Sequence, residues 1–139
     1  MPLVLIPIIT VLVSDFIKAL IKAYNSKKFD IRWMFHSGWM PSGHSSFVSS
    51  AITVVFLEMW PASIEFMLAT VFWILVMYDA RWIRRKAGDH AKILNRLQKE
   101  DSLDEIIWHS SSEVLAGAIF WILFSFILWK TGYFLSTTF

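Results

Sequence analysis

Four long apolar stretches, at residues 2–24, 44–60, 62–80 and 112–130, constrain the fold of this sequence most strongly. They reach or approach the roughly 20 helical residues that cross a ~30 Å hydrocarbon layer, although residues 44–60 begin with polar side chains. The 139-residue chain is 56% hydrophobic, which is too apolar for an ordinary soluble domain of this size. We therefore expect an all-α, polytopic integral membrane bundle of about four transmembrane helices, forming a single domain over residues 1–139.

The basic residues lie on one side of this predicted topology. Twelve of the 13 Lys and Arg residues fall in two groups, which are Lys18, Lys22, Lys27, Lys28 and Arg32, and then Arg81, Arg84, Arg85, Lys86, Lys92, Arg96 and Lys99. The positive-inside rule places both groups on the cytoplasmic side and both termini on the opposite side. Residues 85–99 have the pattern of an amphipathic helix at that cytoplasmic surface. Such charges also attract anionic lipid heads, and no nucleic-acid partner is expected.

The segment Met40-Pro41-Ser42-Gly43-His44-Ser45 joins a loop over residues 25–43 to the second apolar stretch. We expect a helix to begin at His44 or Ser45, with Ser42 or Ser45 as its N-cap. A helix start offers unpaired N–H groups and partial positive charge, and an imidazole can donate a proton near pH 7. This combination favours the handling of a phosphate. The polar residues further along, Ser49, Ser50 and Thr53, suit close helix packing in lipid.

His109 and Glu113 form a second candidate pair, because residues four apart share one face of a helix. A carboxylate one turn away can hold one imidazole N–H and leave the other nitrogen free to attack. The same spacing also suits an ordinary helix-surface pair, and a metal site built from these and other side chains is a further alternative. Its possible ligands are His44, His90, His109, Asp79, Asp89 and Glu113. Because the chain has no cysteine, disulfide and thiolate chemistry are excluded.

Lys18 lies near the end of the first apolar stretch, on the same predicted helix face as Asp15 and Lys22. Charged residues at this depth either face the bundle interior or extend to the interface, so both a functional and a structural role are open for Lys18. Lys22, nearer the helix end, is expected to extend to the interface. The topology brings the end of this stretch, the Pro-Ser-Gly-His turn and residues 79–113 to one membrane face.

These segments resemble the signatures of the small divergent branch of the type-2 phosphatidic acid phosphatase superfamily, which is related to acid phosphatases and vanadium-dependent haloperoxidases. They occur in family order and cover most of the chain. The matching segments are Phe16-Ile17-Lys18, Ser26-Lys27-Lys28-Phe29-Asp30, Met40-Pro41-Ser42-Gly43-His44-Ser45, Asp79-Ala80, Ile83-Arg84-Arg85, Ala87-Gly88, Leu94-Asn95, and His109 with Glu113-Val114.

The resemblance implies a phosphohistidine mechanism. His109 matches the nucleophile, Glu113 stands where the superfamily usually has an aspartate behind that histidine, and His44 matches the acid that protonates the leaving oxygen. The implied phosphate-binding groups are Lys18, Ser42, the Gly43 backbone N–H, and Arg84 or Arg85. The choice of arginine stays open because 23 residues separate Arg85 from His109, and a role for Arg32 is uncertain. Lys and Arg supply charge that a metal supplies elsewhere, so neither a metal nor another cofactor is expected.

The expected function is that of a metal-independent lipid phosphatase in the cell (inner) membrane, with its active site on the cytoplasmic side. Phosphatidylglycerol phosphate is the first choice of substrate, and phosphatidic acid or a polyprenyl (di)phosphate comes next. The alternatives are a non-catalytic protein that binds or transports lipid phosphates, and an enzyme that exchanges phospholipid headgroups through the same phosphohistidine. A bundle of four thin helices also makes a homodimer plausible.

Overall fold

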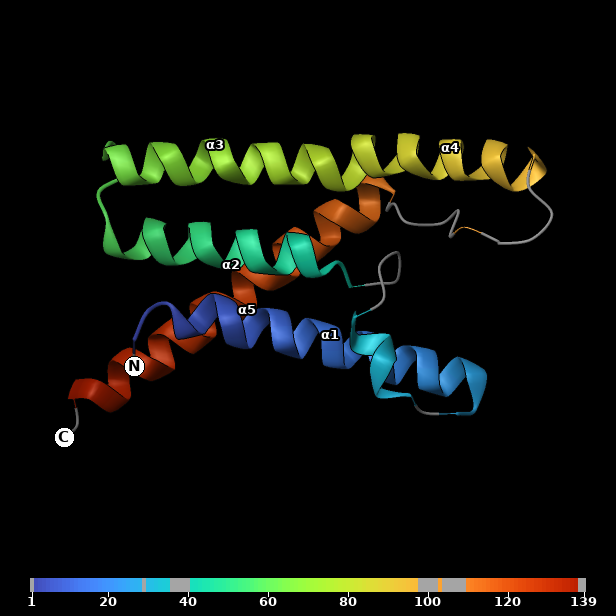
Figure 1. The fold of residues 1–139 in the computed structure, drawn as a ribbon. Coiled ribbons are helices and arrows are strands. Elements are labelled where there is room, and N and C mark those ends of the chain that lie inside the picture. Colours follow the sequence, from blue (N-terminus) through green and yellow to red (C-terminus); the bar gives the residue numbers. More distant parts are fainter. Residues whose placement is uncertain (1, 29, 36–40, 98–102, 104–109, 138–139) are drawn as a thin grey trace.

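The structure is a computed structural model that describes residues 2–28, 30–35, 41–97, 103 and 110–137 (Figure 1). Within these residues all regular secondary structure is helical, as the sequence predicts. The elements in chain order are α1 (Leu5–Ser26), the 3-10 helix η1 (Ile31–Phe35), α2 (Gly43–Glu58), α3 (Ile64–Tyr78), the π-helix η2 (Asp79–Ile83), α4 (Arg84–Leu97) and α5 (Ser111–Thr137).

Successive long helices run in alternating directions, and α2 is the central one. It packs against α1, α3 and α5, and α5 crosses the bundle obliquely (Figure 1). The start of α1, the α2–α3 connection and the end of α5 lie toward one end. The end of α1, the start of α2 and the junction of α3 with α4 lie toward the other. This second end, which we call the basic end, is where the charge distribution predicts the cytoplasmic side.

The third apolar stretch forms a longer helix than the sequence predicts. The amphipathic helix expected at residues 85–99 is present as α4, but it is no separate element, because α3, η2 and α4 form one uninterrupted 34-residue helix from Ile64 to Leu97. At 1.5 Å per residue this helix is about 50 Å long, so it exceeds the ~30 Å thickness of a hydrocarbon layer. If α3 crosses the bilayer, α4 therefore extends beyond it at the basic end.

Within the part of the chain that the structure describes, two helices, Ile64–Leu97 and Val114–Gly132, are long and apolar enough to cross a membrane. The helix α1 contains Asp15, Lys18 and Lys22, and α2 has only 16 residues. An arrangement with four membrane spans therefore remains a prediction.

The outer surface of α3 is suited to lipid rather than water. This helix, all of which is described, has no buried residue. Its exposed large side chains form an apolar surface of a size that soluble monomers rarely display. They include Ile64, Met67, Leu68, Val71, Phe72, Ile74 and Leu75. Such a surface is suited to contact with acyl chains.

Small and hydroxyl-bearing side chains hold α2 between its neighbours. Ser50 donates a hydrogen bond to Thr10 Oγ1 on α1 at 3.2 Å, and Trp73 Nε1 on α3 donates to Ser49 Oγ at 3.0 Å. Thr53 donates to the Ser49 carbonyl of its own helix at 2.6 Å. All three α2 residues are buried, which confirms the packing role predicted for Ser49, Ser50 and Thr53.

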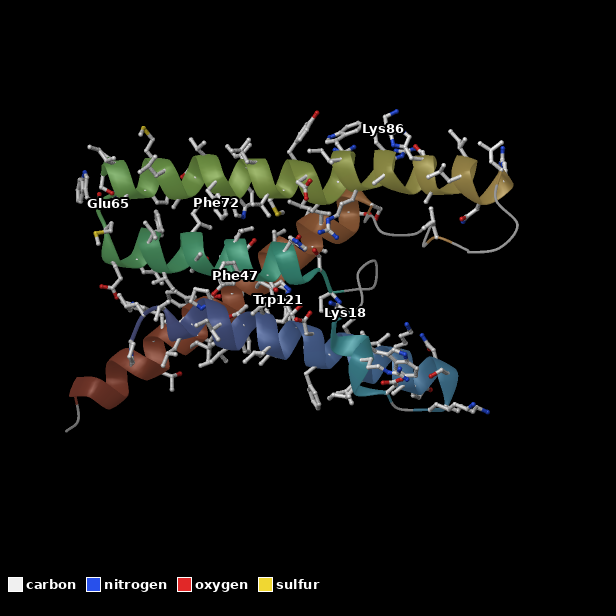
Figure 2. All side chains as sticks on the ribbon, viewed as in Figure 1. Lys18, Phe47, Glu65, Phe72, Lys86 and Trp121 are labelled. Carbon is white, nitrogen blue, oxygen red and sulfur yellow. The ribbon has the colours of Figure 1, made fainter. Side chains whose placement is uncertain are left out.

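At the end opposite the basic end, a side-chain hydrogen bond joins α5 to α2, two helices that also pack against each other. Trp129 Nε1 donates to Glu58 Oε1 at 2.6 Å. Further along the same interface, Trp121 of α5 is completely buried and lies where α5 crosses behind α1 and α2 (Figure 2). These residues hold α5 against the other helices where it crosses them and at the far end. The candidate site lies among the helix termini at the basic end.

Candidate functional site

The start of α2 is the centre of the candidate site. Ser42, in an extended backbone conformation, is its N-cap, and the Ser42 hydroxyl accepts a hydrogen bond from the Ser45 N–H at 3.4 Å. The Ser42 carbonyl accepts from the Ser46 N–H at 3.0 Å. The sequence predicted Ser42 or Ser45 as the N-cap, and the structure shows that it is Ser42. The predicted helix start at His44 or Ser45 was too late, because the helix begins at Gly43. The Gly43 and His44 N–H groups therefore have no acceptor within the helix and carry its partial positive charge.

Lys18 of α1 lies at the same end of the bundle as the start of α2 (Figure 2). It is only 6% exposed, so it does not extend to the interface but faces the bundle interior. Its Nζ lies 2.7 Å from Asp15 Oδ1. A methyl group added to Gly43 would lie 3.2 Å from that same oxygen, so the Lys18–Asp15 pair lies against the first residue of α2. The burial shows which way Lys18 faces, and its role in binding phosphate remains a prediction.

The π-helix places Arg84 beside His44. The Arg84 backbone N–H donates to the Asp79 carbonyl, five residues back. In a regular α-helix residues five apart point about 140° away from each other, whereas the wider π turn brings them to the same side. Arg84 Nε accordingly lies 3.6 Å from Asp79 Oδ2. A single helical irregularity thus sets the direction of the arginine side chain.

Arg84 and His44 are in direct contact, with Arg84 Nη2 at 3.0 Å from His44 Nε2. A guanidinium can only donate hydrogen bonds, so Nε2 is the unprotonated, accepting nitrogen of this imidazole. Of the two arginines that the sequence left open, Arg84 is the one with a described contact to His44. Arg85 follows about 100° further round the helix and is exposed.

The predicted nucleophile cannot be placed in the same way. His109 lies outside the described residues, and so does the side chain of Glu113, although its backbone belongs to the first turn of α5. The helix α5 begins beside the junction of α3 and α4 and contacts η2 (Figure 1). The start of α5 is therefore close to the segment that carries Arg84, and the pairing of His109 with Glu113 remains a prediction.

Other basic residues are engaged locally, away from this cluster. Arg32 Nη2 lies 2.7 Å from Asp30 Oδ2, and the side-chain hydrogen bond from Arg32 lowers the pKa of the Asp30 carboxyl below its ordinary value. Lys22 Nζ lies 5.2 Å from the centroid of the Trp33 ring. These contacts give Arg32 and Lys22 partners on or next to η1.

Two carboxylates of the cluster, Asp15 and Asp79, were not among the residues predicted to bind phosphate or to act in catalysis. Asp15 lies three residues before Lys18, a spacing that places both on one helix face and could have indicated their pairing. The pairing of Asp79 with Arg84 has no such signal, because it depends on the π turn. Among the described residues, no group of three or more His, Cys, Asp or Glu is placed to hold a metal ion.

The fold and the apolar surface indicate a helical membrane protein, and comparison with known proteins supports this and makes it more specific. The model of the divergent PAP2 family, a branch of the phosphatidic acid phosphatase superfamily, matches residues 2–124, and the chain belongs to this family. A protein of Bacillus subtilis (strain 168), called uncharacterized membrane protein YuiD, is 29% identical over 138 residues, covering 85% of this chain and 87% of that protein. No solved structure matches. Family membership indicates a phosphatase-related role and confirms the resemblance found in the sequence.

Proposed function

We propose that the chain is a metal-independent lipid phosphatase that hydrolyses a phosphomonoester at the basic end of the bundle. The observation that supports this most is the convergence of cationic and donor groups from three separate elements. These are the buried Lys18 of α1, the start of α2 with His44, and Arg84 directly after η2. In an otherwise apolar bundle, such a cluster suits a ligand with an anionic head and a hydrophobic tail.

Phosphate binding would use these groups together. Lys18 and Arg84 provide positive charge, and the Gly43 and His44 N–H groups and the Ser42 hydroxyl provide donors at the helix start. Phosphoryl transfer is accelerated mainly by positioning and by charge placed around the equatorial oxygens. The lipid would enter laterally between helices, so that its chains stay in the bilayer while its phosphate reaches the basic end.

The chemical steps follow the phosphohistidine scheme. His109, oriented by Glu113, attacks phosphorus, and an N–P bond forms as the bond to the lipid oxygen breaks. His44 gives its Nε2 proton to that oxygen, which leaves as an alcohol. In the free protein Arg84 donates to Nε2, so the phosphate has to draw Arg84 away before Nε2 can hold this proton. Water then attacks the phosphohistidine, passes a proton to His44, and releases inorganic phosphate and free His109.

A panel of lipid phosphates in detergent or nanodiscs, with a metal chelator present, tests this function. We expect the purified chain to release phosphate, with phosphatidylglycerol phosphate preferred over phosphatidic acid and polyprenyl phosphates. Headgroup exchange would instead transfer the phosphoryl group to an added lipid alcohol. If a well-folded protein binds these lipids and releases no phosphate from any of them, the binding or transport alternative replaces the enzyme.

The cytoplasmic location of the site is a separate part of the proposal. Because the chain contains no cysteine, single cysteines can be introduced without first removing native ones, and each reports only its own accessibility. We expect Ala62→Cys, between α2 and α3, to react with a membrane-impermeant maleimide in intact cells. Lys92→Cys, on α4, should react only after lysis. The opposite labelling pattern would place the site on the outer face.

A further inference from the structure

The carboxylate of Asp15 lies beside both the buried cation of the site, Lys18, and the first residue of α2. Its Oδ1 lies 2.7 Å from Lys18 Nζ and would lie 3.2 Å from a methyl group on Gly43. It is thus paired with the buried cation of the site and lies against the first turn of α2. Its side chain is 22% exposed, whereas that of Lys18 is 8% exposed. Asp15 is therefore the more accessible member of the pair.

We propose that Asp15 is the resident counter-anion of the phosphate site, which an incoming phosphate must displace from Lys18. This inference rests on the proposed function, because it assigns a role within the same site. Lys18 needs a partner in the free protein, since an unpaired charge buried in an apolar bundle is costly. Asp15 supplies that partner from the preceding turn, without any ligand.

Competition of this kind determines which anions the site retains. A carboxylate close to a bound phosphate repels it, and this interaction is strong where water is scarce. For free phosphate, only the contacts of its charged oxygens with the site can compensate for loss of the Lys18–Asp15 contact. A lipid phosphate also buries its chains among the helices, and that remote binding energy can offset the displacement of Asp15. Asp15 thus favours phosphates that carry a lipid tail and promotes release of the inorganic phosphate product.

Asp79 has a similar position beside Arg84, but its ion pair is longer and more exposed than that of Asp15 with Lys18. Asp79 lies 3.6 Å from Arg84, and their side chains are 39% and 26% exposed. Water screens this pair more than the Lys18–Asp15 pair, and Arg84 keeps its contact with His44. The displacement of Asp15 from Lys18 is therefore the event that should dominate the affinity for free phosphate.

The test is the affinity of the full chain in nanodiscs for inorganic phosphate, measured by titration calorimetry for the wild type and for Asp15→Asn. The asparagine removes the charge and keeps an oxygen that can accept from Lys18. We expect Asp15→Asn to bind phosphate at least about tenfold more tightly. The matched control Asp89→Asn removes a carboxylate from an exposed pair with Lys92 on α4 and should leave the affinity unchanged. The gain should disappear when Lys18→Met is combined with Asp15→Asn.

Asp15→Ser is measured alongside, so that a result is obtained even if Asp15→Asn folds poorly. We expect Asp15→Ser also to bind phosphate more tightly than the wild type. Equal or weaker phosphate binding by a folded Asp15 variant would overturn the inference. If the wild type hydrolyses lipid phosphates in that case, the proposed function still stands. Conversely, tighter phosphate binding by Asp15→Asn in a protein without turnover would support the counter-anion role and contradict the phosphatase.

Discussion

Replacement of His109 by alanine is expected to lower phosphate release from the preferred lipid by at least about a thousandfold, because no other group is proposed to attack phosphorus. Lipid binding should change little, since the proposed phosphate contacts come from α1, α2 and the segment after η2. The measurement is a phosphate-release assay together with a lipid-binding assay on the same preparation.

His90→Ala is the matched control for this variant. His90 is an exposed histidine on α4, outside the proposed site, so its replacement removes an imidazole without touching the cluster. We expect full phosphate release from His90→Ala. Turnover by His109→Ala close to the wild-type rate would contradict the role of nucleophile and would require another group to attack phosphorus.

Replacement of His44 by alanine is expected to slow hydrolysis of a lipid phosphate by about 10²–10⁴-fold, the usual contribution of a general acid. The leaving group of a lipid phosphate is an alkoxide, which departs poorly without a proton. A nitrophenolate leaving group is stable as an anion and departs without being protonated. The loss should therefore be much smaller for an alkylated nitrophenyl phosphate that carries its own hydrophobic chain.

This dependence on the leaving group separates acid catalysis from binding. His44 contacts Arg84 at 3.0 Å, so His44→Ala also changes the surroundings of the arginine. A disturbed Arg84 would affect both substrates alike, since both present the same phosphate. Equal losses for the alkyl and the nitrophenyl ester would show that His44 helps to bind phosphate and does not protonate the leaving oxygen.

Local sequence signals predicted the start of α2 well. A Pro-Ser-Gly-His turn before an apolar run indicates a capped helix, and Ser42 is that cap. The burial of Ser49, Ser50 and Thr53 was also predictable, because small hydroxyl residues recur on one face of the helix. In each case the residues that determine the structure are neighbours along the chain or along one helix face.

The features that the sequence did not predict depend on a change in helical geometry or on contacts between elements. A π turn at residues 79–83 shifts the register of the helix, and no spacing typical of a regular α-helix reveals this shift. The pairing of Arg84 with Asp79 follows from it. The approach of Asp15 to Gly43 joins two helices, so it could be found only once α1 and α2 were packed together.

Hydrolysis of a lipid phosphate through a phosphohistidine can be tested by trapping the intermediate. The wild-type chain would be mixed with its preferred lipid phosphate, labelled with ³²P, quenched in alkali within milliseconds to seconds, and mapped by peptide mass spectrometry. We expect an alkali-stable, acid-labile phosphate on His109 that disappears as inorganic phosphate is released, with none in His109→Ala. Release of phosphate with no label on His109 at any quench time would rule out a phosphohistidine at this position.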